Sequence, residues 1–600
     1  MKISVTKLCL LLYAVSFLLY ANTINNGFVL DDGDLILNNN LVSNGTQSIP
    51  EILVTPYRYG VLKTDNDLYR PLSLVMFAAE YQLSSGKPML SHVINVILFA
   101  FCVVVLFLFL LQLLGNEKTT IAFLAALIFA FHPIHTEVVA NIKSRDELLC
   151  FLFGISSLLL AILYGKKGNC FFLLLSIVCY FLSLFSKETS ITLLIVFPFI
   201  FLFFPKWKRR RNLTFLFSII IVASVYLILR QNVLTRYNAN QSMNVDFIDN
   251  MLVGAPTNSI KIATSIFILG KYLQLLVFPH PLVCDYTYNS IPFTNFNSYN
   301  VAVTIIVYLV LVVGVFYFLK KNKAIALAIF WYLSSISLFS NFLFPVGVPM
   351  AERFLFLPSV GFCMVAAISL EKWLVKENIF SLKNYQLLAT LFTLLALYAI
   401  KTINRNSDWK DNLTLFEQDG KTQPMNARLA YYYGTELTKV ATTNFDINNQ
   451  NEQFHKAIIK LHQAIEIYPE FELAYVQLAS TFFKLKQNDS ALYYNLKALQ
   501  LNNFNSLTHY NIAGVYFSQK KYETSKQHCL QAIQIKPKWA DAYTSLALCY
   551  VQMNNTDSCI YNLRQSININ PNKRAFEMLY LVYDNLGEMD SVNKYKLLAK

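Results

Sequence analysis

The chain has 600 residues, of which 55% are hydrophobic and 14% are charged. Soluble domains usually carry about a quarter charged residues, so this composition excludes an ordinary soluble enzyme. The formal net charge is +14, and most of it lies in the apolar part of the chain before residue 405. A basic membrane domain indicates positive cytoplasmic loops and not nucleic-acid binding. The 10 cysteines include no Cys-x-x-Cys pair, so neither a zinc site nor a disulfide framework is indicated.

Apolar runs close to the length of a membrane span fill the chain up to residue 404. A helix needs about 20 apolar residues to cross the hydrocarbon core. Eleven runs are found, at residues 5–21, 90–114, 120–137, 147–164, 170–186, 189–205, 212–230, 300–319, 324–343, 354–370 and 385–403. We expect the first run to be a retained anchor and not a signal peptide, because Tyr20-Ala21-Asn22 lacks a clear small-x-small cleavage site. The sequence therefore predicts an all-α membrane domain over residues 1–404 with about eleven spans.

Short loops rich in Lys and Arg predict the orientation, because such loops stay on the cytoplasmic side. These loops lie at residues 166–167, 206–211, 320–323 and 371–383. A further apolar stretch at 258–279 would break this pattern if it crossed, so we expect it to be re-entrant or interfacial. Eleven crossings from a cytoplasmic N-terminus leave the C-terminal domain outside, with the long loops 22–89 and 231–299. This topology fits a bacterial inner membrane with a periplasmic C-terminal domain, or an endoplasmic reticulum membrane in a eukaryote.

A fixed step of 34 residues appears in the C-terminal part of the chain. The recurring positions are Ala464, Ala498, Ala532 and Ser566, followed at the same step by Pro469, Asn503, Pro537 and Pro571. A 34-residue period is typical of the helix-turn-helix tetratricopeptide repeat. The sequence therefore predicts an α-solenoid of repeats over residues 424–600, after a linker at 405–423.

The two ends of the repeat array are expected to differ from its middle. An early unit starts at Pro424, with Ala427 and Gly434, and is interrupted by a polar insertion at 441–450. The last unit, from about residue 574, has lost the pattern, as a terminal cap does. Such an array implies a concave surface that binds a protein segment. The alternative is an appendage that serves folding or oligomerisation.

Three carboxylates follow the first apolar run, Asp31, Asp32 and Asp34 in NGFVLDDGDLILNNNLV. Three acids in four residues repel one another unless a proton, a cation or a substrate holds them there. One of them could act as general base for a hydroxyl group. Asp32 and Asp34 also fit the loose Asp-x-Asp pattern that binds a divalent cation. A solvated loop with Asx turns is the third interpretation.

The segment HPIHTEVVANIKSRDELL, which begins at His132, places many polar residues between two apolar runs. Ionisable residues are costly near a bilayer and are often functional there. Lys143 and Arg145 suit a phosphate, which Arg binds in a bidentate manner. His132, His135 and Glu137 resemble metal ligands in type, but the proline between the two histidines prevents a long helix from presenting them on one face. Snorkelling of the charged side chains to the interface is the alternative.

Three smaller charged clusters fall on the same predicted face. They are Arg70 in Tyr-Arg-Pro-Leu, Lys187 with Glu188 in Ser-Lys-Glu-Thr, and Glu352 with Arg353 in Ala-Glu-Arg-Phe. The cations of these motifs could bind an anionic substrate. The adjacent acid and base in the last two motifs could also be simple ion pairs at helix ends.

The order of these motifs resembles the transmembrane and tetratricopeptide repeat-containing O-mannosyltransferases over almost the whole chain. The matching motifs are D-D after the first span, Y-R-P-L, H-P-I-H-T-E-V-V with a following R, S-K-E, K-Y-L-Q-L-L-V-F-P-H-P-L-V-C-D-Y at 271–286, and A-E-R-F-L-F-L-P-S. That family is similar to the wider GT-C class of multi-span glycosyltransferases. The resemblance implies an active site on the outer face, a mannose donor linked to a polyprenyl phosphate, and Ser/Thr acceptors on proteins. It maps the catalytic acids of the family onto Asp31 and Asp32 without deciding which of the two is the base.

The chemistry expected from this resemblance is a single inverting displacement. Asp31 or Asp32 would take the proton of the acceptor hydroxyl, and no cofactor is required, although a divalent cation is compatible with Asp32 and Asp34. The charge of the donor phosphate would be held by cations, namely Arg70, Arg145, Lys187 and Arg353, with support from His132, His135, Glu137 and Glu352.

Three other functions compete with this interpretation. A glycan polymerase or ligase on the same fold would use the same residues and differ in its acceptor. A non-catalytic membrane scaffold that presents the repeats would need neither the paired aspartates nor Arg145. A transporter would place ionisable residues near the midplane of internal repeats, whereas the charges here gather at one face, so transport is disfavoured.

Overall fold

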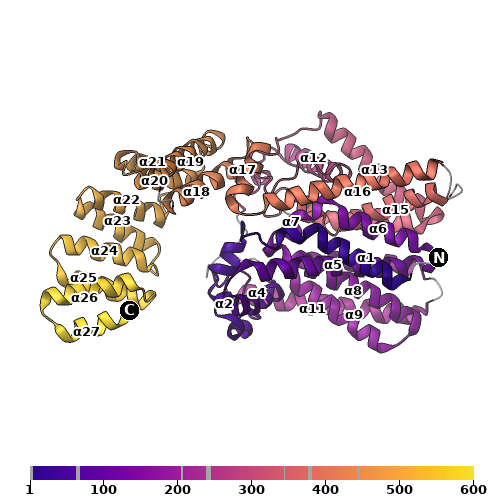
Figure 1. The fold of residues 1–600 in the computed structure, drawn as a ribbon, viewed down its shortest axis with the longest axis horizontal. Helices are drawn as coiled ribbons and strands as arrows, with labels where there is room; N and C mark the ends of the chain where they lie inside the picture. Colours follow the sequence, from indigo (N-terminus) through magenta and orange to yellow (C-terminus); the bar gives the residue numbers. More distant parts are fainter. Residues whose placement is uncertain are drawn as a thin grey trace. The chain divides into compact units, whose positions relative to one another are not determined.

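The computed structural model describes residues 4–61, 68–204, 207–237, 245–342, 345–375, 382–443 and 446–599. The chain divides into two compact units, residues 1–424 and 425–600, which we call the membrane unit and the repeat unit. Both are built from helices (Figure 1), and no β-strand occurs in the described ranges. The all-α expectation is therefore confirmed.

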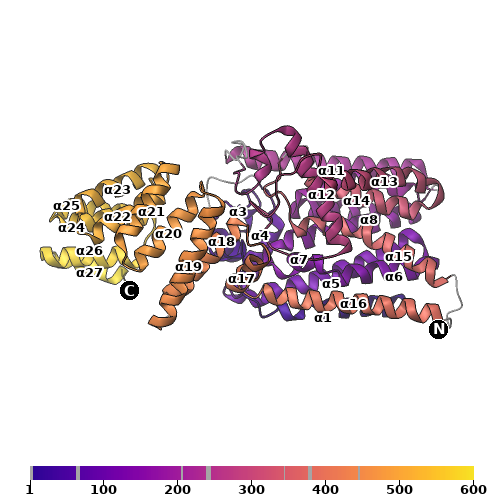
Figure 2. The same ribbon diagram turned by 90° about the horizontal axis from the view of Figure 1, so that it is seen from above.

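Long apolar helices run lengthwise through the membrane unit (Figures 1 and 2). Six of the described helices are long and apolar enough to cross a membrane, and a pair bent by 56° makes up to seven. The six contain α1 (Val5–Tyr20), α5 (Pro88–Leu114), α8 (Arg145–Lys167), α11 (Arg209–Arg236), α12 (Asn258–Val277) and α13 (Tyr299–Lys321). The bent pair contains α6 (Thr119–Phe131) and α7 (Thr136–Ala140). A domain with several membrane helices is thereby confirmed.

Shorter or less apolar helices occupy the other expected spans. They are α9 (Cys170–Ser186), α10 (Leu193–Phe201), α14 (Lys323–Ile336), α15 (Ser359–Val375) and α16 (Leu382–Asp408). Length and composition single out six or seven spans among the described helices. The total of eleven crossings goes beyond that number and stays a prediction.

The core of the membrane unit lies between α5, α6 and α8. Phe99 and Leu106 of α5 and Phe129 of α6 are fully buried there. In contrast, α13 is apolar on all sides yet exposes side chains such as Ile306 and Phe316. A helix that is hydrophobic all round belongs in a protein core or in a membrane, so α13 presents a lipid-facing surface.

Basic loops gather at one end of the membrane unit, which we call the basic end. Lys166, at the end of α8, donates to the last turn of α5 at 2.9 Å. Lys323, at the start of α14, donates to the Leu202 carbonyl after α10 at 2.9 Å. Arg211, in the first turn of α11, donates to the Gly165 carbonyl at 3.0 Å. This arrangement agrees with the expected grouping of the basic loops, and the membrane side on which they lie stays a prediction.

Both flanks of α12 lie at the opposite end, which we call the polar end. Before α12, Asn250 donates to the Val346 carbonyl at 2.7 Å, in the loop between α14 and α15. Near its other end, the Leu276 carbonyl accepts from His132, which follows α6, at 2.9 Å. The length of α12 would let it cross a membrane. Because both flanks contact loops of the polar end, the geometry favours the re-entrant or interfacial interpretation.

Residues 405–423, which the sequence analysis took as a linker, are a helical part of the membrane unit. They comprise the end of α16 and the helix α17 (Asn412–Thr422). Arg405 forms two hydrogen bonds with Asp419, at 2.6 and 2.9 Å, and both side chains are nearly fully buried. Asp419 also accepts from the Cys284 N–H at 2.6 Å. The segment is thus packed inside the membrane unit, and the boundary between the two units lies at residues 424–425.

The first long loop folds into a small subdomain at the polar end. It contains α2 (Asn40–Ser43), α3 (Ile49–Ile52) and α4 (Pro71–Ser84). Its own apolar core includes Leu35, Val42 and Phe77, packed with Ile142 from the segment between α7 and α8. This core fixes the acidic loop against the start of α8.

The repeat unit consists of consecutive helix pairs. They are α18 (Ala427–Thr443) with α19 (Ile447–Ile467), α20 (Glu472–Lys484) with α21 (Asn488–Leu501), α22 (Ser506–Ser518) with α23 (Tyr522–Ile535), α24 (Ala540–Gln552) with α25 (Thr556–Ile569), and α26 (Lys573–Leu586) with α27 (Met589–Leu598). Gly434 allows the first pair to approach closely, since a Cβ there would lie 2.7 Å from the Leu461 side chain. Where it is described, the expected polar insertion at 441–450 belongs mainly to the helices α18 and α19. The predicted solenoid of helix pairs is confirmed.

Candidate active site

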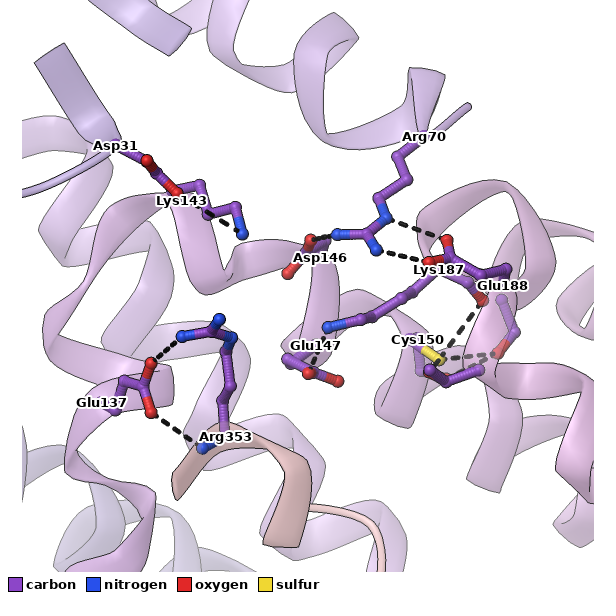
Figure 3. A network of polar contacts seen from close by, with 12 residues as sticks. Asp31, Arg70, Glu137, Lys143, Asp146, Glu147, Cys150, Lys187, Glu188 and Arg353 are labelled. Carbon is purple, nitrogen blue, oxygen red and sulfur yellow. Dashed lines mark hydrogen bonds and ion pairs between the residues drawn. The ribbon is translucent and has the colours of Figure 1, made fainter. Parts of the chain in front are cut away.

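Charged side chains from five separate segments meet at the polar end of the membrane unit (Figure 3). We call this group the polar-end cluster, and its members are Asp31, Arg70, Glu137, Lys143, Asp146, Glu147, Lys187, Glu188 and Arg353. Asp146 and Glu147 lie in the first turn of α8, where the helix dipole stabilises negative charge. The cluster unites five of the motifs that the sequence analysis singled out separately.

Arg70 joins three of these segments. Its guanidinium contacts Asp146 at 2.6 Å and both oxygens of Glu188, at 2.9 and 2.5 Å. The side chain is 7% exposed. A planar guanidinium can serve two carboxylates at once, so Arg70 fixes the start of α4 against α8 and the turn after α9.

Two more cations are each held by one carboxylate. Lys187 forms an ion pair with Glu147. The guanidinium of Arg353 pairs with Glu137, whose second oxygen accepts from the Arg353 backbone N–H at 2.8 Å. The adjacent acid and base of Ser-Lys-Glu therefore do not pair with each other, because Lys187 and Glu188 have different partners. These contacts orient the cations toward a common space in Figure 3.

Asp32 is buried behind the cluster and holds the acidic loop in place. Its two oxygens accept from the backbone N–H groups of Val29, at 3.1 Å, and Lys143, at 2.7 Å. Burial raises the pKa of its carboxyl to about 7, against the lowering effect of these hydrogen bonds. Asp32 is therefore placed to fix the loop rather than to meet a substrate.

Asp31 is partly exposed to solvent and lies beside the cations of the cluster. Its side chain is 45% exposed and lies 3.4 Å from Arg58 and 3.9 Å from the Lys143 ammonium. Leu30, directly before it, has a φ of 51°, which is uncommon for a non-glycine residue. The Leu30 N–H donates to Asn412 at 2.9 Å, so α17 supports this backbone conformation. Strained backbone of this kind often occurs at functional sites.

The third acid of the loop stands apart. Asp34 accepts from Asn38 at 3.2 Å on the exposed side of the turn that follows. Because Asp32 uses its oxygens on backbone N–H groups, the geometry does not form the expected cation site from Asp32 and Asp34. The described residues also contain no group of three or more His, Cys, Asp or Glu side chains suited to a metal ion.

Arg145, expected to bind the donor phosphate, is instead an internal structural residue. It is fully buried, pairs with Glu80, and donates to Asn95 at 2.8 Å and to the Ser91 carbonyl at 2.9 Å. Lys143, two residues earlier, faces the cluster. Each residue of an α-helix is rotated by about 100° about the helix axis from the residue before it. Side chains two positions apart near the start of a helix, such as those of Lys143 and Arg145, therefore point to different sides. The structure therefore replaces Arg145 with Lys143 as the cation of this segment at the cluster.

The two histidines of the same segment support the fold and do not enter the cluster. His132 donates to Leu276 through Nε2 and accepts from the Ile134 N–H through Nδ1 at 3.2 Å. The ring of His135 packs against Phe129 with centroids 4.3 Å apart. Neither ring nitrogen of His135 has a hydrogen-bond partner among the described residues. A packing role explains both side chains without a metal.

Glu352 faces away from the cluster and anchors the loop after α12. It accepts from the Val283 N–H at 2.5 Å and from the Tyr286 hydroxyl at 3.0 Å. Burial raises the pKa of its carboxyl to about 8. Its neighbour Arg353 points into the cluster, and the supporting role of Glu352 for that cation stays a prediction.

A small pocket adjoins the cluster on the side toward the apolar core. It is lined by Glu147, Cys150, Phe151, Gly154, Thr189, Leu193, Phe356 and Leu357. The pocket therefore begins at the cluster carboxylate of Glu147 and continues between apolar side chains of α8, α10 and the segment before α15.

Comparisons with known proteins agree with the resemblance of the motifs. The tetratricopeptide repeat family matches residues 508–538 and 540–573. Protein O-mannosyl-transferase F38B6.6 of Caenorhabditis elegans is 29% identical over 445 residues, which cover 73% of this chain and 61% of that protein. Protein O-mannosyl-transferase TMTC3 of Mus musculus is 27% identical over 501 residues, 79% of this chain and 52% of its own length. The chain thus resembles these proteins over most of its length and spans about half to three fifths of theirs.

The crystal structure of MamA aligns with 26% of this chain and 94% of its own, at 23% identity and a TM-score of 0.24.

Proposed function

We propose that this chain is a membrane glycosyltransferase that moves a sugar, in the first place mannose, from a polyprenyl phosphate to Ser/Thr hydroxyls of proteins on the non-cytoplasmic face. The observation that carries the proposal is the partly exposed carboxylate of Asp31 beside the cations of the polar-end cluster. The names of the similar proteins give the same reaction class. A general base next to a phosphate site is the combination that this reaction needs.

Asp31 is the proposed base. Its exposure and its position beside Lys143 support this role, whereas Asp32 is buried and uses both oxygens on the backbone. The ammonium of Lys143 lies 3.9 Å from Asp31 and favours the ionised carboxylate that can accept a proton. Asp32 then acts as the positioning residue of the loop.

The donor phosphate is proposed to sit among the cations of the cluster, Arg70, Lys143, Lys187 and Arg353. Each of them has more than one N–H donor, so an ion pair with one carboxylate leaves other donors for phosphate oxygens. Because the ion pairs of these cations are buried, water screens their charges less, and the attraction between the cations and the phosphate is stronger.

In the proposed reaction, the acceptor oxygen attacks the anomeric carbon of the donor sugar. Asp31 takes the hydroxyl proton as the new C–O bond forms. The bond between the anomeric carbon and the phosphate oxygen breaks, and the polyprenyl phosphate leaves with the electron pair. A single displacement inverts the anomeric centre. A second acid is not needed, because the leaving phosphate is already a weak base and the cations stabilise its charge.

The repeat unit is proposed to bring protein segments to the polar end. Arrays of this kind bind extended segments along their concave face, and tethering raises the local concentration of the acceptor. In this proposal the repeat unit and the polar end lie on the non-cytoplasmic side, because the basic end carries the loops that stay inside. A glycan polymerase would use the same base and cations with a sugar hydroxyl as acceptor.

The test is transfer of label in membranes that contain the full chain and a labelled polyprenyl-phosphate mannose. We expect label on protein with the unaltered chain and with Asp34→Asn, which serves as the matched control in the same loop. Asp31→Asn should remove transfer while the protein accumulates normally. Label that moves to glycan and not to protein would favour the polymerase. Equal transfer by Asp31→Asn and by the unaltered chain would refute the proposed base.

A further inference from the structure

One oxygen of the polar-end cluster is buried without a partner. Asp146 is 1% exposed, and its Oδ2 accepts from Arg70 at 2.6 Å. Its Oδ1 has no hydrogen-bond partner among the described residues. In Figure 3 this oxygen is turned toward the space between Lys143, Lys187 and Arg353.

An unsatisfied charged oxygen is unfavourable in a folded protein, because burial removes the water that would otherwise bind it. More than nine tenths of buried polar groups have a partner, and exceptions call for an explanation. Asp146 also cannot turn away freely, since Arg70 holds its other oxygen and Glu188 holds Arg70. The open oxygen is therefore fixed in a direction that suits an incoming donor.

The surroundings decide what kind of donor fits. Lys187 is already paired with Glu147, and Arg353 with Glu137. A carboxylate repels phosphate oxygens, so the charged part of a lipid donor would lie on the cations and not on Asp146. The part of that donor next to the phosphate is a sugar, whose hydroxyl groups are neutral hydrogen-bond donors. A hydroxyl at Oδ1 would satisfy the open oxygen without adding charge to the cluster.

From this geometry we infer that Asp146 is a specificity-determining residue that accepts a hydrogen bond from one ring hydroxyl of the donor sugar through Oδ1. This inference rests on the proposed function and adds the part of the site that selects the sugar. Arg70 is then a positioning residue for Asp146 as well as a phosphate ligand. The hydroxyl, held at a fixed carboxylate, orients the anomeric carbon toward Asp31.

The experiment compares donors that each lack one hydroxyl. Full-length protein in membranes is given polyprenyl-phosphate mannose or its 2-, 3-, 4- or 6-deoxy analogue, and kcat/KM for transfer to protein is measured. A hydrogen bond to a charged group is worth a factor on the order of 10 to 100. With the unaltered chain, we expect one deoxy donor to be discriminated against by about this factor.

The variants then assign that discrimination to Asp146. Asp146→Ala should transfer from the mannosyl donor and from that deoxy donor with nearly equal kcat/KM. Asp146→Asn keeps the shape, but its single oxygen would stay on Arg70 and its NH₂ group would replace the acceptor Oδ1. It should therefore reduce the discrimination, and it covers the case in which the Ala variant does not fold. Asp34→Asn is the control, because Asp34 lies outside the polar-end cluster and accepts a hydrogen bond from Asn38, so this variant should keep the full discrimination.

The outcomes separate the inference from the function on which it rests. No transfer from any donor by the unaltered chain would overturn the proposed function together with the inference. Transfer without discrimination against any deoxy donor would overturn the inference alone. The same would follow if the Asp146 variants discriminated as the unaltered chain does, since a water molecule or a Lys143 rotation would then satisfy Oδ1.

Discussion

The neighbouring acids Asp31 and Asp32 are expected to respond differently to the same substitution. Asp31→Asn removes the proposed base and changes few contacts, because the side chain is 45% exposed. Loss of a positioned general base typically costs about 10² to 10⁴ in rate, which corresponds to about 3 to 5 kcal/mol in the activation free energy. The folded protein should accumulate and unfold at the normal temperature.

Asp32→Asn should act on stability first. The amide offers one acceptor oxygen, so one of the N–H groups of Val29 and Lys143 would face an NH₂ group instead of an oxygen. Leaving a buried donor unsatisfied costs about 1 to 3 kcal/mol in the free energy of unfolding. The loop that carries Asp31 would also loosen, so we expect a partial loss of transfer together with a lower melting temperature.

Because the pKa of Asp32 is raised, the effect of Asp32→Asn on the melting temperature should depend on pH. The folded pKa, about 7, lies above the ordinary value of 3.8, so the folded state binds the proton more tightly. The stability contributed by the protonated group is present at low pH and is lost as the pH rises through about 7. The difference in melting temperature between Asp32→Asn and the unaltered chain should therefore narrow from pH 5.5 to pH 8.5.

The assays are transfer of labelled mannose to protein and thermal unfolding of the purified full chain, with Asp34→Asn as the control in both. The assignment of roles would be refuted if Asp32→Asn abolished transfer without changing the melting temperature while Asp31→Asn stayed active. In that case the buried carboxyl would have to reach the acceptor, and the loop would need to open during the reaction.

Three further predictions follow from single contacts. Arg145→Ala leaves Glu80 buried without its partner. It should therefore lower the free energy of unfolding by about 3 to 5 kcal/mol and reduce accumulation of the protein in membranes. Lys143→Ala should instead fold normally and raise the KM for the lipid donor about tenfold. Glu352→Gln should make the melting temperature depend less on pH between pH 6 and 9. The reason is that the stability contributed by protonated Glu352 is lost as the pH rises through its folded pKa of about 8. An unchanged slope of melting temperature against pH would contradict this prediction. Gly434→Val should destabilise the repeat unit by about 1 to 3 kcal/mol, because the new Cβ would lie 2.7 Å from the Leu461 side chain. Thermal unfolding of the full chain should then show a lower melting temperature for the repeat unit and an unchanged one for the membrane unit.

Several features of the protein were set by local sequence patterns. The 34-residue step predicts the helix pairs of the repeat unit, because each unit repeats the same packing with its neighbours. The apolar runs predict the membrane helices, since a helix in lipid must satisfy its own backbone and expose apolar side chains. The acidic loop and the three cationic motifs were also visible as polar residues next to apolar runs.

Other features depend on contacts between distant segments. Arg70 meets Glu188 across 118 positions of the chain, and Arg353 meets Glu137 across 216. The segment 405–423 was predicted as a linker, whereas Asp419 within it contacts Arg405 and Cys284 inside the membrane unit. No local signal distinguishes a solvated charge from one that is paired inside the fold.

The sequence by itself determined that an acid of the first loop and a group of cations lie on one face of a membrane helix domain. The tertiary structure decided that Asp31 and not Asp32 is partly exposed, and that Lys143 and not Arg145 faces the polar-end cluster. The physical reason is the same in both cases. Two acids or two cations that lie close together in the sequence belong to the same local pattern. Which of them is buried, and in which direction its side chain points, depends on the elements that pack around it.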